Sequence, residues 1–70
     1  MSKIKNFLLN GEKYHIESTI TLLDLINYFD YNTSLLVIEY NNSICNKKNW
    51  NKISIDENDK IEIVTIVGGG

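Results

Sequence analysis

One amphipathic segment lies between several short strand-like runs, and this arrangement restricts the chain to few folds. Leu22, Leu25, Ile26 and Phe29 fall at positions i, i+3, i+4 and i+7, so their side chains share one face of a helix. We therefore predict a single helix over residues 22–29, with one apolar side to bury.

A capping box is predicted at the start of this helix, because Thr21 is followed three residues later by Asp24. The Thr21 hydroxyl can accept a hydrogen bond from an early backbone amide of the helix, and a carboxylate in the first turn interacts favourably with the positive end of the helix dipole.

The residues before the helix are typical of a hairpin. Asn10-Gly11 separates two strand-like runs, residues 3–9 and 12–17. Asn-Gly is the dipeptide best suited to a type I′ turn, because both positions need a positive φ. We therefore predict two antiparallel strands joined by this turn.

The residues after the helix predict three more strands. A β-branched and aromatic run over residues 35–40 ends at Asn41-Asn42, which tolerate left-handed turn conformations. Ile44 and Cys45 suggest a short fourth strand, and the following residues suggest a helical turn that carries Trp50. The last predicted strand covers residues 60–67.

The order β-β-α-β-β-β predicts an α+β fold, with a mixed sheet and one helix packed on one face. With the final strand beside the first, this is a β-grasp arrangement, although periodicity alone leaves it one topology among a few. We assign residues 1–67 to this domain and residues 68–70 to a flexible glycine tail. Cys45 is the only cysteine, so no internal disulfide is possible, and a reducing compartment is expected.

Charge and hydropathy argue against two classes of partner. The net charge is −2, and the seven basic residues are all lysines that form no basic stripe, so no nucleic-acid partner is expected. No stretch approaches the roughly 18 apolar residues of a membrane span, and no signal-peptide pattern is present, so we expect no membrane partner and no export. The abundance of Ile, Asn and Lys hints at an AT-rich bacterial or organellar genome.

Catalytic residues are not indicated. His15 alternates with charged residues and is interpreted as a surface histidine, while Cys45 is interpreted as a semi-buried filler. Trp50 is expected to cover one end of the core. Three acids near a turn are interpreted as solvated side chains: Asp56, Glu57 and Asp59. We expect that the protein is not an enzyme and binds no metal or cofactor of its own.

The C-terminus is the feature that folding does not explain. Gly68, Gly69 and Gly70 lack Cβ atoms, and together they form a thin arm able to reach about 10 Å into a narrow channel. The α-carboxylate of Gly70 is a poor electrophile, because its reference pKa of about 3.5 keeps it ionised. Transfer of AMP from ATP would make it an acyl adenylate that a sulfur nucleophile can attack. The competing interpretation is a frayed end without a role.

Partner docking is predicted on the sheet face away from the helix. If Ile61 and Ile63 face the helix, Val64 and Ile66 form an exposed apolar strip beside the tail. We name Val64, Ile66 and Val67 as candidate docking residues. The competing interpretation is that a neighbouring loop covers them.

With these residues in view, the chain resembles the ThiS-type sulfur carriers of thiamin biosynthesis, which belong to the ubiquitin-like β-grasp group. The resemblance extends over nearly the whole chain and rests on "FLLNGEKYHI", the helix start "TLLDLI", "EYNNSI", Trp50 and "NDKIEIVTIVGGG". The strand "DKIEIV" and the terminus "VGGG" are its most specific parts.

The resemblance implies a chemistry for the tail. Gly70 would be adenylated by a ThiF-like, E1-type enzyme that uses ATP and Mg, and then converted to a thiocarboxylate. Gly68 and Gly69 would thread into the partners. The implied partners also include a ThiG-like thiazole synthase and a sulfur donor such as a cysteine desulfurase. The expected location is the cytoplasm, or the plastid stroma if the gene is organellar.

Three alternatives stay open. A molybdopterin-synthase small subunit uses the same tail chemistry with another sulfur acceptor, but such chains tend to carry a proline-containing segment before Gly-Gly, and this chain has no proline. A ubiquitin-like modifier would form isopeptide bonds. A plain interaction module would keep its binding and function after loss of Gly69 and Gly70.

Overall fold

The computed structural model describes residues 4–29 and 35–65. The first two strands, β1 (Lys5–Leu9) and β2 (Glu12–Ile16), pair antiparallel, with Phe7 opposite Tyr14. The turn between them has φ values of 51° at Asn10 and 83° at Gly11, as a type I′ turn requires. The predicted hairpin is therefore confirmed, with strands slightly shorter than the predicted runs.

The helix α1 (Leu22–Tyr28) begins with the predicted capping box. The Asp24 amide donates to Thr21 Oγ1 at 3.1 Å, and the Thr21 amide donates to Asp24 Oδ2 at 2.9 Å. The helix ends one residue earlier than predicted, because Phe29 has φ −89° and ψ 0° and serves as the C-cap.

The remaining strands are β3 (Leu36–Tyr40), β4 (Ser43–Cys45) and β5 (Lys60–Thr65), and a short 3-10 helix, η2 (Lys47–Asn49), leads to Trp50. The sheet order is β2-β1-β5-β3-β4, with β5 parallel to β1 and antiparallel to β3. The final strand therefore lies beside the first, as predicted. The prediction that it continues through residues 66 and 67 lies outside the described residues.

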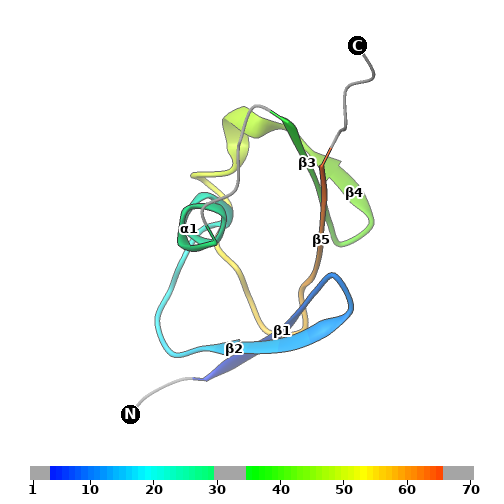
Figure 1. Ribbon diagram of the computed structural model, residues 1–70. Helices are drawn as coiled ribbons and strands as arrows, with labels where there is room; N and C mark the ends of the chain where they lie inside the picture. The colour runs from blue at the N-terminus through cyan, green and yellow to red at the C-terminus, as the bar shows by residue number, and fades with distance from the viewer. Residues whose placement is uncertain (1–3, 30–34, 66–70) are drawn as a thin grey trace.

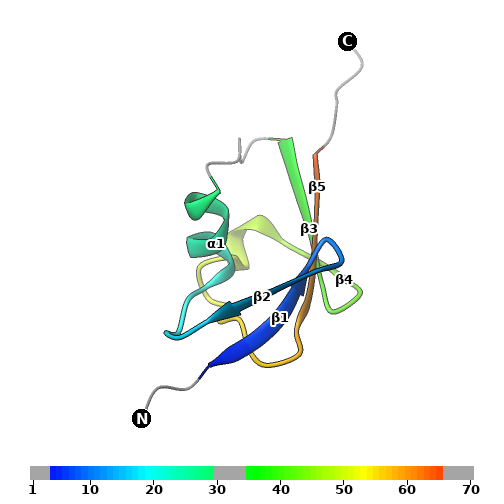
Figure 2. The same cartoon turned by 60° about the horizontal axis from the view of Figure 1, so that its bottom comes forward.

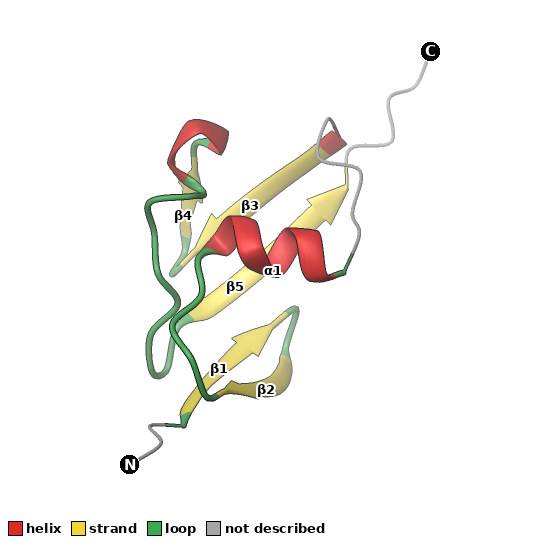
Figure 3. Cartoon of the chain, turned by 90° about the vertical axis from the view of Figure 1, so that its left-hand side faces the viewer, coloured by secondary structure: helices red, strands yellow, loops and turns green. Residues whose placement is uncertain are grey.

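Two layers result, with α1 on one side of the mixed sheet (Figure 1, Figure 3). Figure 2 shows the β1–β2 hairpin crossing the direction of β3 and β5, which is the twist expected of such a sheet. The core between the layers is closed by Trp50, which is 1% exposed and donates its indole hydrogen to the Cys45 carbonyl at 3.2 Å. The expected role of Trp50 in the core is confirmed.

One interpretation from the sequence is wrong. Asp59 is not solvated but 7% exposed. Its carboxylate accepts hydrogen bonds from the Tyr40 hydroxyl, the Asn41 side chain and the Asp56 amide. A buried carboxylate is tolerated here because several donors replace the water that it loses. Asp56 and Glu57 are exposed, as expected.

Candidate functional site

The sheet face opposite α1 carries the predicted docking strip. Alternation along β5 turns Ile61 and Ile63 toward the core, where they are 0% and 8% exposed, and leaves Val64 on the other face at 49%. The orientation expected for these three residues is confirmed. The other named site residues, Ile66, Val67 and the three glycines, lie outside the described residues.

Neighbouring strands enlarge this face beyond what the sequence suggested. Val37 on β3 stands directly opposite Val64, and Ile44 on β4, which is 74% exposed, stands opposite Glu39. We call Val37, Ile44 and Val64 the outer apolar patch. Alternation in the run "LVIEY" is enough to predict the face on which Val37 lies, but a local pattern does not identify the strand that pairs with it.

Two carboxylates lie beside the outer apolar patch. Glu39 and Glu62 are directly opposite each other on β3 and β5, a position where like charges repel. Within the described part of the chain, neither forms an ion pair; the pair found there joins Lys5 to Asp56 at 3.8 Å. Apolar side chains next to uncompensated acids are typical of a surface that binds a partner with apolar and basic side chains.

The described residues offer no candidate metal centre. Over residues 4–29 and 35–65, no group of three or more His, Cys, Asp or Glu residues is placed to hold a metal ion. Burial raises the pKa of the Cys45 thiol, which disfavours the reactive thiolate. Cys45 is half-buried, as predicted, and His15 is exposed. The described helices include none long and apolar enough to cross a membrane.

The described residues therefore leave an apolar patch exposed on the sheet face away from α1. The strand β5 passes through the middle of the sheet, between β1 and β3, and its last described residues lead toward the C-terminus (Figure 1). A partner seated on the outer apolar patch would contact the same strand that continues into the terminal residues.

Comparison with known proteins finds relatives over nearly the whole chain. The ThiS family model matches residues 7–70. A protein named ycf40 from Trieres chinensis is 67% identical over 70 residues, which cover 100% of this chain and 96% of that protein. The sulfur carrier protein ThiS of Bacillus subtilis is 32% identical over 63 residues, covering 89% of this chain and 96% of that one.

Two further matches concern the fold and the protein context. The crystal structure of the thiamine biosynthesis protein ThiS from Geobacter metallireducens has a TM-score of 0.80 at 16% identity, covering 93% of this chain and 99% of that one, and shows the same β-grasp fold. A thiazole synthase from Paramagnetospirillum magneticum is 27% identical over 63 residues, which cover 90% of this chain but 19% of that protein.

Proposed function

The chain belongs to the ThiS family, and from this membership we propose that it is a sulfur carrier for thiazole formation in thiamin biosynthesis. The observation that carries the proposal is the family match over residues 7–70, which includes the three terminal glycines as well as the folded domain. The protein supplies a reactive terminus, and its partners supply catalysis.

We propose the following chemistry for Gly70. Its carboxylate oxygen attacks the α-phosphorus of ATP, pyrophosphate leaves, and an acyl adenylate forms on the carrier. Hydrosulfide then attacks the carbonyl carbon, AMP leaves, and a thiocarboxylate remains. With a protein persulfide as the nucleophile, an acyl disulfide forms first, and a second thiol reduces it to release the thiocarboxylate and leave a disulfide on the donor. ATP and Mg belong to the activating enzyme. Gly68 and Gly69 suit threading into a narrow channel, because they have no side chains to clash with its walls.

Three partners follow from this chemistry. A ThiF-like, E1-type adenylating enzyme activates Gly70, a cysteine desulfurase or a similar donor supplies sulfur, and a ThiG-like thiazole synthase accepts it. The similarity of this chain to part of a thiazole synthase supports the last partner, because a carrier-like segment occurs there within one polypeptide. We propose that partners dock on the outer apolar patch and place basic side chains near Glu39 and Glu62.

For the location, we propose the plastid stroma rather than the cytoplasm. The relatives that carry the ycf40 name support the plastid, and the codon usage implied by the many Ile, Asn and Lys residues agrees with an organellar genome.

The test is the intact mass of the chain before and after incubation with a ThiF-like enzyme, MgATP and sulfide. We expect a mass gain equal to replacement of one oxygen by sulfur, abolished when Gly70 is deleted. Transfer of the sulfur to a thiazole synthase, but not to a molybdopterin-synthase large subunit, then identifies the acceptor. An unchanged mass, or an isopeptide product in its place, would overturn the proposal.

A further inference from the structure

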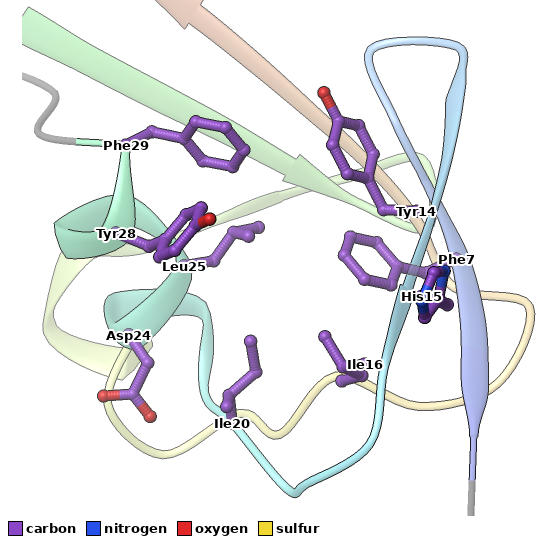
Figure 4. Close-up of a pocket in the computed structure, with 9 residues that line it drawn as sticks. All are labelled: Phe7, Tyr14, His15, Ile16, Ile20, Asp24, Leu25, Tyr28 and Phe29. Carbon is purple, nitrogen blue, oxygen red and sulfur yellow. The ribbon is translucent and has the colours of Figure 1, made fainter.

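A second surface lies on the helix side of the sheet, away from the outer apolar patch. A hollow of about 460 Å³ opens between α1 and β2 (Figure 4). Its size falls within the range of ligand-binding clefts, roughly 300–1,000 Å³. Figure 4 shows apolar side chains facing one another across it from the two elements and from β1. The lining combines Phe7, Tyr14, Ile16, Ile20, Leu25 and Phe29 with the exposed Tyr28 and the polar side chains His15 and Asp24.

Aromatic rings form a continuous wall along this hollow. The ring of Tyr14 lies 6.0 Å from that of Phe7 and 6.0 Å from that of Phe29, and Tyr28 lies 5.1 Å from Phe29. Phe29 is 36% exposed and Tyr28 is 81% exposed. Large aromatic side chains at the rim of an apolar hollow give a ligand area to bury at little entropic cost.

The strand that borders the hollow is an edge of the sheet. Among the strands that the structure describes, in the order β2-β1-β5-β3-β4, β2 has a neighbour on one side only. The amide of Leu8 donates to the Asp59 carbonyl at 2.9 Å, so the backbone of Leu8 faces β5 rather than β2. Its cross-strand partner Lys13 therefore points its own amide and carbonyl outward, and so does His15 two residues later. These groups can pair with one more strand.

The side chains of β2 indicate which sequence an added strand should have. Tyr14 and Ile16 lie on the side of the hollow, so a strand added there would place its apolar residues over it. Lys13 alternates with Tyr14 and lies on the opposite face, where it is exposed; His15 is exposed too and also borders the hollow. A carboxylate on the incoming strand across from the charged Lys13 is a favourable cross-strand pairing. Glu17 alternates in the same phase as Lys13, so it would repel an acidic residue of the incoming strand placed opposite it.

From this juxtaposition we propose that the α1–β2 hollow and the free edge of β2 together bind an extended peptide segment in which acidic and apolar residues alternate. Lys13 also disfavours one pairing with a second copy of this chain, because an antiparallel pair of β2 strands centred on Lys13 would set the two lysines against each other. A lysine on an edge strand is a common protection against self-pairing. This site does not involve the terminal glycines. A failure of peptide binding would therefore not count against the carrier function, and a failure of the carrier function would not count against peptide binding.

The test uses the full-length protein and a short peptide in which glutamate alternates with isoleucine, followed by amide chemical shifts in NMR titrations. We expect the largest shifts at Lys13, His15 and Phe29. The variant Lys13→Glu should lower the affinity by about fivefold. The matched control Lys60→Glu changes an exposed lysine two strands away and should leave the affinity unchanged.

Backbone pairing is tested with the peptide itself. Methylating every second amide nitrogen removes the hydrogen-bond donors along one edge of the extended peptide. Methylation of the edge that pairs with β2 should abolish binding, and methylation of the other edge should not. Equal effects of both methylations would overturn strand addition. Four other outcomes would overturn the proposal as well. The peptide could fail to bind, could shift only Val37 and Val64, or could bind less well than a lysine–isoleucine peptide. Light scattering could also reveal a dimer whose interface includes Lys13.

Discussion

The Tyr40 hydroxyl donates a hydrogen bond of 2.6 Å to Oδ2 of Asp59, which lies 19 residues further along the chain. Asp59 also accepts from the Asn41 side chain at 3.1 Å, and Oδ1 of Asn41 in turn accepts from the Lys60 amide at 2.7 Å. This network joins the β3–β4 turn to the start of β5, the strand that leads to the terminal glycines. Its loss should therefore weaken the element on which the carrier depends.

Replacing Tyr40 by Phe should lower the free energy of unfolding by about 2 kcal/mol, because a hydrogen bond to a buried carboxylate is lost. Urea denaturation followed by Trp50 fluorescence measures the change. Tyr28→Phe is the matched control, since Tyr28 is 81% exposed. Equal stabilities of the two variants would contradict the importance of the network.

The same tyrosine predicts a pH dependence. Burial, and then the hydrogen bond to Asp59, raise the pKa of Tyr40 from 10.0 to about 12. Because the pKa is higher in the folded state, the protonated phenol stabilises the fold fully below pH 10.0, and this contribution is lost as the pH rises toward about 12. Urea unfolding across this interval should show a steeper loss of stability in the wild-type protein than in Tyr40→Phe. Parallel curves would show that Tyr40 does not cause the loss.

The capping box predicts a smaller effect at the start of α1. Thr21→Ala removes the acceptor of the Asp24 amide and should cost about 1 kcal/mol of stability. Ser18→Ala, an exposed change before the helix, should be close to neutral. Chemical denaturation of both variants, with circular dichroism as the readout, gives the comparison. A cost at Ser18 as large as that at Thr21 would argue against a specific cap.

Trp50→Phe should cost about 2 kcal/mol, because it leaves a cavity in the core and removes the donor to the Cys45 carbonyl. Thermal unfolding by circular dichroism is the suitable measurement, since the substitution removes the fluorescent probe. Retention of the wild-type melting temperature would mean that Trp50 contributes little to the core, despite its 1% exposure.

The outer apolar patch predicts a loss of binding without a loss of folding. The double variant Val37→Ser and Val64→Ser should weaken the complex with a ThiF-like enzyme by about tenfold, which corresponds to about 1.4 kcal/mol. Isothermal titration calorimetry measures the affinity, and Thr65→Ser on the neighbouring position serves as control. Wild-type affinity in a folded double variant would exclude this face as the docking surface.

Local rules in the sequence determined the main elements. The turn at Asn10-Gly11, the apolar stripe of α1 and its capping box depend on residues within one or two turns of each other, so spacing alone predicts them. The phase of Ile61, Ile63 and Val64 follows from alternation. The glycine terminus is likewise read directly from the sequence. It indicates a function because no folding role requires three consecutive glycines there.

Only the tertiary structure decided which distant groups meet. The first two amides of α1 donate to the carbonyls of Ile53 and Trp50, each at 3.0 Å, and no local pattern identifies those acceptors. Burial of Asp59 likewise depends on Tyr40 and Asn41 reaching it from another strand. The outer apolar patch and the α1–β2 hollow arise from strand order, because side chains far apart in sequence share a surface only when the sheet places their strands side by side.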